Sequence, residues 1–350
     1  MPAASIVIRA KNEARFLDRT LQMVYCQTVR DIEVIVVDSG SVDGTLDIAK
    51  RYPTRLVEIP PEAFTFGHSL NVGCREAASD YIVLLSAHAV PCDEAWLSNL
   101  LHPFQVDMVA GVGGSDHTWF DGIDTLASKY RYSKTLDVTN YHPKNAAWGF
   151  AASNGAVDRR VWQEHEFNEG LMASEDKDWA WRVIRAGYRI VYQPSAAVFH
   201  EHELTPLQAY RRAWREHYSY ALVMPDLRFG VLDLVRGLIE RPRGGLWRAV
   251  TSNTAQETPP ARLGSGAEWA SPPTPPLADS ICPIVRLRRK VANTWDVRHY
   301  GRHFAPKSRL GRVARRLVVR FMVNLGRYRG LKAGQAAVSD RMGGGGVEGS

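Results

Sequence analysis

Apolar runs alternate with amphipathic segments through the first part of the chain. The run Ile32-Glu33-Val34-Ile35-Val36-Val37 is rich in β-branched residues, which is typical of a strand buried on both faces. Strands are expected at residues 5–10, 32–37, 56–59 and 81–85. Helices are expected at residues 12–27, 45–52 and 69–78. Strands that alternate with helices predict an α/β fold with a mostly parallel central sheet covered by helices.

The second half of the chain is less regular. Helices are expected at residues 174–186 and 208–221, short strands at 190–192 and 196–202, and a loop or strand edge at Gly111-Val112-Gly113-Gly114. Residues 251–280 are rich in Pro, Ser, Thr and Gly, a composition typical of a flexible linker. The predicted parts are one folded domain at residues 1–240, a linker at 241–280, a basic helical tail at 281–335 and a flexible Gly-rich end at 336–350.

Length and composition favour an intracellular globular protein. The chain has 350 residues, of which 45% are hydrophobic, enough for a substantial core. Its four cysteines are far apart in sequence, so neither a disulfide framework nor a structural zinc site is expected. The apolar run before Arg9 is too short for a signal peptide, and no stretch is long enough to span a bilayer. We therefore expect a cytoplasmic protein.

Positive charge is concentrated near the C-terminus. From Ile281 onward there are 16 Lys and Arg residues and three acidic residues, a net charge of +13, so the rest of the chain carries −6 within the total of +7. Apolar residues recur there at helical spacing, namely Leu317, Val318, Phe321 and Leu325. This pattern favours a helix that lies on an anionic membrane surface, with a solvated basic helix as the alternative. Nucleic acid is not an expected partner, because the body shows no nucleic-acid-binding motif.

Asp38 follows directly on the most hydrophobic run. Ligands of open parallel sheets bind beyond the carboxyl ends of the strands, where a carboxylate can accept a hydrogen bond from a nucleobase or a ribose hydroxyl. The competing interpretation is a structural turn or helix cap, since Asp38 leads into the turn sequence Ser39-Gly40-Ser41.

Asp38 is part of a longer string that is more specific than the single carboxylate, namely Val36-Val37-Asp38-Ser39-Gly40-Ser41-Val42-Asp43-Gly44-Thr45. Together with Lys11-Asn12-Glu13-Ala14 upstream, it resembles the first half of family 2 glycosyltransferases with the GT-A fold. Phe64-Thr65-Phe66-Gly67-His68-Ser69-Leu70-Asn71-Val72-Gly73 is similar to the segment before the third helix in rhamnosyltransferase-like members. The resemblance covers roughly residues 5–205 and implies a nucleotide-sugar donor, a saccharide or lipid-linked acceptor and inversion at the anomeric carbon.

Two further segments carry the implied chemistry. Ser174-Glu175-Asp176-Lys177-Asp178 looks like the Glu-Asp element of the family, which makes Asp176 the implied catalytic base. A capping interpretation competes with it, because acids in a first helical turn are stabilised by the helix dipole. The donor is assigned to Ala10, Asn12, Glu13, Asp38, Ser86 and Trp148.

The metal-binding element departs from the family. Tyr81–Pro91 occupies the place of the Asp-x-Asp element, but Ser86 and His88 stand where the carboxylates are expected. His88 is a candidate metal ligand, and His200 is the candidate further ligand late in the domain. Imidazole and phosphate ligands favour Mn²⁺ over Mg²⁺. A hydrogen-bonded His88 without a metal is the alternative.

The sequence thus predicts a metal-dependent inverting glycosyltransferase of cell-surface polysaccharide or glycolipid assembly, peripheral on the inner face of the membrane. A catalytically inactive nucleotide-sugar-binding scaffold is one rival, because the metal element is altered. A sugar nucleotidyltransferase is another, although Arg9-Ala10-Lys11-Asn12 is not a Gly-rich phosphate loop.

Overall fold

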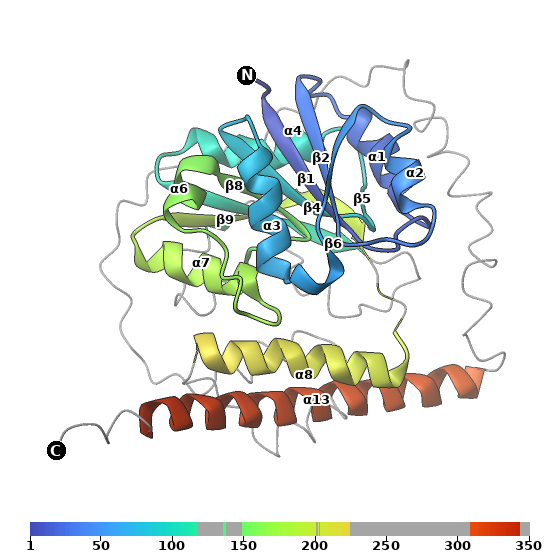
Figure 1. The fold of residues 1–350 in the computed structure, drawn as a ribbon, viewed down its shortest axis with the longest axis vertical. Helices are drawn as coiled ribbons and strands as arrows, with labels where there is room; N and C mark the ends of the chain where they lie inside the picture. Colours follow the sequence, from blue (N-terminus) through green and yellow to red (C-terminus); the bar gives the residue numbers. More distant parts are fainter. Residues whose placement is uncertain (118–135, 138–148, 201, 203, 225–308, 344–350) are drawn as a thin grey trace.

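A computed structural model describes residues 1–117, 136–137, 149–200, 202, 204–224 and 309–343. The described residues form a layered α/β body with a pair of long helices lying along one side of it (Figure 1). Trp148 and the whole predicted linker, residues 241–280, lie outside the described residues.

One sheet runs through the body. Its strands are β1 (Ala4–Ala10), β2 (Ile32–Asp38), β3 (Thr54–Glu58), β4 (Tyr81–Ser86), β5 (Ala89–Pro91), β6 (Val109–His117), β7 (Leu136–Asp137), β8 (Asn154–Asp158) and β9 (Arg189–His200). The order is β3-β2-β1-β4-β8-β6-β9-β5, and β7 pairs with β9. The first four strands of that order are parallel, while β8 is antiparallel to both β4 and β6. Parallel β1, β2 and β4 end together, which brings the residues that follow them to one edge.

Helices cover both faces of this sheet. They are α1 (Leu17–Tyr25), α2 (Thr45–Ala49), α3 (Phe66–Glu76), α4 (Trp96–Leu101), α6 (Arg159–Glu164) and α7 (Glu175–Arg185), with 3₁₀ turns at Pro61–Ala63 and His102–Gln105. One core cluster joins α3, α6 and α7 to the sheet, and a second joins α1, α2 and α4 to the opposite face. The strands β1, β2 and β4 are buried because both faces are covered.

Two predictions for the later strands differ from the structure. The glycine segment at residues 111–114 is not a loop but part of β6, which lies between β8 and β9. The backbone there is so close to its neighbours that a Cβ on Gly113 would lie 2.0 Å from the carbonyl oxygen of Gly149. The two short strands predicted around Pro194 are one strand, β9, whose register shift between Gly114 and Ser115 accommodates the proline.

The two long helices pack against each other. The helix α8 (Pro206–Val223) and the helix α13 (Arg309–Gly343) lie side by side (Figure 1). A small-residue ridge on α13 faces the backbone of α8: Cβ atoms on Gly326, Gly330 and Gly334 would lie 2.4, 2.2 and 2.6 Å from carbonyl oxygens or a methyl group of α8. Because both residue series increase together, the helices run parallel.

The helix α13 therefore differs in extent from the predicted tail. It continues through residues 336–343, which were predicted to belong to a flexible end, because the helix-forming residues Gln335, Ala336 and Ala337 extend the helix toward the glycine run. Leu331 is buried in the same core cluster as residues of α7, so α13 packs onto the body. In the part of the chain that the structure describes, no helix has the length and hydrophobicity that a bilayer crossing needs.

Candidate active site

Three histidines meet beside the ends of β4 and β9. His88 lies between β4 and β5, His200 is the last residue of β9, and His202 follows it. One ring nitrogen from each lies within 4.8 Å of the others, and the Nε2 atoms of His88 and His200 are 3.1 Å apart. The structure thus brings together the two predicted metal ligands and adds a third imidazole, which sequence reasoning did not assign.

Carboxylates contact two of these rings at Nδ1, the ring nitrogen other than the Nε2 atoms that face each other. The Nδ1 atom of His88 lies 2.7 Å from Glu13 Oε1, and Nδ1 of His200 lies 3.2 Å from Asp116 Oδ2. A hydrogen bond from Nδ1–H to a carboxylate fixes the tautomer and leaves Nε2 with an available lone pair. Within the described residues, the other oxygen of Asp116 is buried without a hydrogen-bond partner. These donors fit a divalent metal, with imidazole nitrogens as ligands and acids that orient them.

The surroundings of His202 favour its neutral form. Although the residue is exposed, burial of its imidazole within the cluster lowers the pKa of His202, and Arg212 together with the other two imidazoles lowers it further. A neutral imidazole keeps the lone pair that a metal requires. His202 is therefore a competent third ligand.

The helix α7 positions Asp176 at its first turn. Its Oδ1 accepts a hydrogen bond from the backbone N–H of Lys177 at 2.7 Å, and Oδ2 accepts one from Ala152 N–H at 3.2 Å. The Lys177 ammonium lies 3.6 Å from the same carboxylate. The preceding Ser174 occupies the N-cap position in the left-handed region, with φ of +69°, but its side chain makes no capping hydrogen bond. Asp178 pairs with Arg182 at 2.9 Å, so its carboxylate is committed elsewhere.

Glu175 is a buried carboxyl that forms an ion pair with Arg9. Its Oε1 lies 3.4 Å from the guanidinium of Arg9, which also lies 5.2 Å from the centre of the Phe66 ring. Burial raises the pKa of Glu175 from its ordinary 4.5 to about 7; Arg9 opposes this shift and Asp176 reinforces it. The surroundings of Glu175 thus favour its protonated form.

This raised pKa makes stability depend on pH. Since the folded state holds a proton more tightly than the unfolded state, the contribution of Glu175 is fully present below pH 4.5 and is lost as pH rises through about 7. Urea unfolding between pH 5 and 8 should show wild-type stability falling by up to about 3 kcal/mol from this residue. Glu175→Gln should remove most of that slope, whereas Glu62→Gln, at an exposed position, should not. An unchanged slope in Glu175→Gln would contradict the assignment.

The predicted donor residues around Asp38 form a connected loop. Asp38 has no exposed surface, and its Oδ2 accepts hydrogen bonds from the backbone N–H groups of Gly40 and Ser41 at 2.9 and 2.8 Å. Asn12, with φ of +55°, accepts a bond from Val42 N–H and donates its own N–H to Ser41. The contacts of Asp38 within the described residues are those of a turn, which matches the competing interpretation of its role.

The other residues that were predicted to bind the donor do not all lie together in the structure. Glu13 bonds His88 of the histidine cluster, and Ser86 is half-buried at the end of β4, two residues before His88. Ala10 is buried at the end of β1, where it pairs with Asp38 in the sheet. Trp148 falls outside the described residues.

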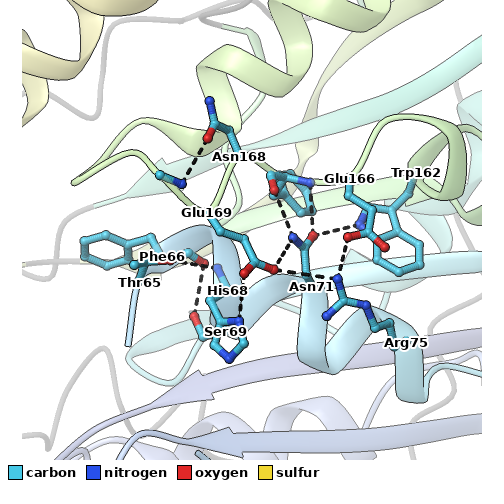
Figure 2. A network of polar contacts seen from close by, with 12 residues as sticks. Thr65, Phe66, His68, Ser69, Asn71, Arg75, Trp162, Glu166, Asn168 and Glu169 are labelled. Carbon is cyan, nitrogen blue, oxygen red and sulfur yellow. Dashed lines mark hydrogen bonds and ion pairs between the residues drawn. The ribbon is translucent and has the colours of Figure 1, made fainter. Parts of the chain in front are cut away.

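A polar network fixes the segment that leads into α7, and sequence reasoning assigned no role to its members. Asn71 of α3 is fully buried and uses both ends of its amide (Figure 2). Its Nδ2 donates to Phe167 O at 2.9 Å and Glu169 Oε1 at 2.8 Å, and its Oδ1 accepts from Trp162 Nε1 at 3.2 Å and Phe167 N–H at 3.0 Å.

His68 extends the network. Its Nδ1 lies 2.9 Å from Glu169 Oε2, and a Cβ on the preceding Gly67 would lie 2.4 Å from the carbonyl oxygen of Asn168. Although burial raises the pKa of Glu169, hydrogen bonds from Asn71 and His68 and the charge of Arg75 lower it overall. The motif Gly67-His68-Ser69-Leu70-Asn71 therefore packs α3 against residues 166–170. The motif was visible in the sequence, but its partner segment was not.

Comparison with solved structures defines the class of fold. The mannosyltransferase PcManGT from Pyrobaculum calidifontis, solved in complex with GDP-Man and Mn²⁺, superposes with a TM-score of 0.53 at 17% identity, covering 92% of this chain and 86% of that one. The body is thus a GT-A-type fold, and the predicted fold class is confirmed.

Sequence comparison identifies the family. Residues 5–165 match the family described as Glycosyl transferase family 2. The O-antigen chain rhamnosyltransferase WbaN of Salmonella anatum is 30% identical over 200 residues, which cover 53% of this chain and 62% of WbaN. RfbN of Salmonella typhimurium, described in the same words, is 26% identical over 220 residues, covering 59% of this chain and 69% of RfbN. Residues 5–165 therefore form a family 2 glycosyltransferase domain, as the resemblance predicted.

Proposed function

We propose that the chain is an inverting glycosyltransferase that moves a sugar from a nucleoside-diphosphate donor to a hydroxyl of a saccharide or lipid-linked acceptor. The observation that carries the proposal is the placement of Asp176. Its carboxylate is half-buried at the start of α7, held by two backbone N–H groups and a lysine, in a domain of glycosyltransferase family 2. A carboxylate held this way can accept the proton of an acceptor hydroxyl as its oxygen attacks the anomeric carbon.

The donor would lie along the carboxyl ends of β1, β2 and β4. We place the nucleoside at the loop built by Asn12 and Asp38, in which Asp38 shapes the turn, and the diphosphate near Ser86 and His88. A divalent metal held by His88 and His200 would neutralise the leaving diphosphate. With imidazole ligands, Mn²⁺ should support transfer better than Mg²⁺. The mannosyltransferase of similar fold was solved with Mn²⁺.

The biological setting follows from the relatives. WbaN and RfbN are described as O-antigen chain rhamnosyltransferases, so we propose polysaccharide assembly as the setting and a deoxyhexose as the sugar to test first. The chain spans 62% and 69% of the lengths of these two relatives.

Transfer with inversion tests the function directly. The full chain is incubated with Mn²⁺, a panel of nucleotide-sugars and simple saccharide or polyprenyl-phosphate-linked acceptors, and the anomeric configuration of donor and product is compared by NMR. We expect turnover of one donor class with inversion. Donor binding without transfer or hydrolysis for any member of the panel would instead support the inactive scaffold. Formation of nucleoside triphosphate and sugar 1-phosphate from a nucleotide-sugar and added pyrophosphate would support a nucleotidyltransferase.

We further propose that α13 carries the protein to an anionic membrane surface. Its glycine ridge faces α8, yet Val318 and Phe321 stay 50% and 42% exposed one turn apart. Arg329 and Lys332 are exposed further along the same helix. Apolar and basic side chains that packing against α8 leaves free are suited to an interface with anionic headgroups.

Vesicle sedimentation tests the membrane proposal. The full chain should sediment with vesicles containing phosphatidylserine more than with neutral vesicles, and added salt should weaken this because charge attraction is screened within about 8–10 Å. Val318→Ser/Phe321→Ser and Lys332→Gln should each reduce sedimentation, whereas Lys50→Gln, an exposed lysine on α2's C-cap, should not. Equal binding to both vesicle types, or none, would refute the proposal.

A further inference from the structure

Tyr220 of α8 lies where three helices meet near the candidate base. It belongs to one core cluster with Ala180 of α7 and Leu331 of α13, and only 6% of its surface is exposed. Figure 1 shows α8 between α7 and α13. A phenol buried at such a junction needs a partner for its hydroxyl, because an unpaired polar group in a core is costly.

The groups around the Tyr220 phenol come from all three helices. Burial raises the pKa of Tyr220 well above its ordinary 10, and the charges of Glu216 and Asp176 raise it further. Hydrogen bonding to Ser174 and the charge of Arg327 lower it. Ser174 is the N-cap residue of α7, two positions before Asp176, and Arg327 belongs to α13. The phenol thus connects the start of α7 to the end of the chain.

Ser174 has a conformation that α7 alone does not explain. Its φ of +69° lies in the left-handed region, which a residue with a Cβ adopts only at a cost in free energy. A serine at this position commonly caps the helix with its hydroxyl, but the Ser174 side chain makes no capping hydrogen bond. The hydroxyl is engaged by Tyr220 instead, so α8 contributes to holding the residue at which α7 begins.

Arg327 brings α13 to the same phenol. The residue is only 8% exposed, and its guanidinium donates a hydrogen bond to Asn324 Oδ1 at 3.3 Å. Burial lowers the pKa of Arg327, and the negative charge of Glu216 on α8 opposes this shift. Gly326 and Gly330 lie on either side of Arg327 in the sequence and allow the backbone of α13 to approach α8 closely. Arg327 is therefore a buried cation whose compensating charge lies on the neighbouring helix.

We propose that Tyr220 is a positioning residue for Asp176: it anchors Ser174, the residue at which α7 begins, and α13 keeps Tyr220 in place through Arg327. The inference goes beyond the proposed function by giving the helix pair α8 and α13 a part in catalysis. It rests on that function only for the role of Asp176 as the base.

The hydrogen bonds of Asp176 show how the anchor would act. One comes from the N–H of Lys177, which moves with α7, and the other from the N–H of Ala152, which lies outside the helix. A shift of the first turn of α7 would therefore preserve the first bond and break the second. Asp176 would remain a base but would lie at a different distance from the acceptor hydroxyl.

Tyr220→Phe tests the anchor, because it keeps the ring in the core and removes only the hydroxyl. We expect kcat to fall about 10-fold with the donor KM nearly unchanged, since a small misplacement of a reacting group costs up to about 100-fold. In the Asp176→Asn background the same change should alter kcat less than about 2-fold, because the two residues act as one unit. Tyr218→Phe is the matched control on the same helix; its ring, stacked on Trp214 at 5.2 Å, is kept and kcat should not change. An unchanged kcat in Tyr220→Phe, or full additivity with Asp176→Asn, would overturn the proposal.

Arg327→Gln tests the part assigned to α13. It should lower kcat to about the level of Tyr220→Phe and change kcat less than about 2-fold when combined with it. Arg327→Lys, which keeps the charge, should restore part of the loss. Arg215→Gln, at an exposed arginine of α8, should leave kcat unchanged. Wild-type kcat in Arg327→Gln would overturn the role of α13.

Ser174→Gly guards against simple loss of folding. Glycine adopts a positive φ without the cost that a Cβ brings, so the midpoint of urea unfolding should not fall. The hydroxyl is lost all the same, and kcat should fall as in Tyr220→Phe. Wild-type kcat in the folded Ser174→Gly variant would show that Tyr220 does not act through Ser174 and would overturn the proposal.

Hydrogen exchange separates this outcome from that of the proposed function. Without substrates, the backbone amides of residues 174–178 should exchange faster in Tyr220→Phe than in the wild type or in Tyr218→Phe, because the first turn of α7 opens more readily. Faster exchange in a chain that transfers no sugar would leave the anchor standing and remove the transferase. Sugar transfer by the wild type, with exchange and kcat unchanged in Tyr220→Phe, would do the reverse.

Discussion

Asp176→Asn should lower kcat at least about 100-fold while donor affinity stays nearly unchanged. The asparagine keeps the size of the side chain, and its Oδ1 can still accept the hydrogen bond from Lys177 N–H that Asp176 makes at 2.7 Å. It cannot take a proton from the acceptor hydroxyl. Steady-state kinetics with calorimetry of donor binding separate the two quantities.

Asp178→Asn is the matched control. Asp178 lies on the same helix, is more deeply buried and bonds to Arg182 Nε at 2.9 Å, so it should affect stability more than kcat. If Asp178→Asn lowers kcat more than Asp176→Asn, the base has been misassigned. If Asp176→Asn weakens donor binding as much as it lowers kcat, Asp176 contacts the donor rather than the acceptor.

The regular part of the fold was readable from local patterns. The predicted strands at 5–10, 32–37 and 81–85 correspond to β1, β2 and β4 within a residue or two, because burial on both faces demands unbroken apolar runs. The predictions failed for the later strands, where close approach of neighbouring backbones decides the structure. In β6 the glycines exist because neighbouring strands and the segment at Gly149 leave no room for side chains, a constraint that appears only when the strands are assembled.

The pairing of α13 with α8 was also missed, because it too depends on close approach of two backbones. The charge and apolar spacing of the tail were visible and predicted a surface helix, but Gly326, Gly330 and Gly334 at intervals of four were not used. Small residues at that spacing form a flat ridge on one helical face. That signal could have indicated close helix packing, although nothing local could have named α8 as the partner.

The sequence predicted some members of the candidate site and missed others, because it does not show which strands lie next to each other. His88, His200 and Glu13 were chosen one by one from motifs, and the structure places all three in one cluster. The prediction named His200 and not His202, although alternation along a strand places both residues on one face. No sequence pattern indicated a role for Asp116, because its contact with His200 joins two strands, β6 and β9, that are far apart in the sequence.

Asn71 illustrates how much a single buried amide can hold together. Its four hydrogen bonds reach Trp162 of α6 and Phe167 and Glu169 in the segment before α7 (Figure 2). These residues are about one hundred positions away in sequence, so no local pattern predicts them. Since the amide has no exposed surface, water cannot replace the bonds it makes.

Asn71→Ala should therefore lower the free energy of unfolding by about 3 kcal/mol. The truncation leaves Trp162 Nε1 and both backbone groups of Phe167 buried without partners, and each such group costs about 1–3 kcal/mol, partly relieved by relaxation of the segment. Urea unfolding followed by tryptophan fluorescence measures the loss. Asn168→Ala is the control, because Asn168 is exposed and bonds only the nearby Gly170 N–H at 3.0 Å among the described contacts, so it should cost less than about 1 kcal/mol. Comparable losses in the two variants would show that the network in Figure 2 contributes no more than an exposed turn, and that α3 does not hold the segment before α7 in place.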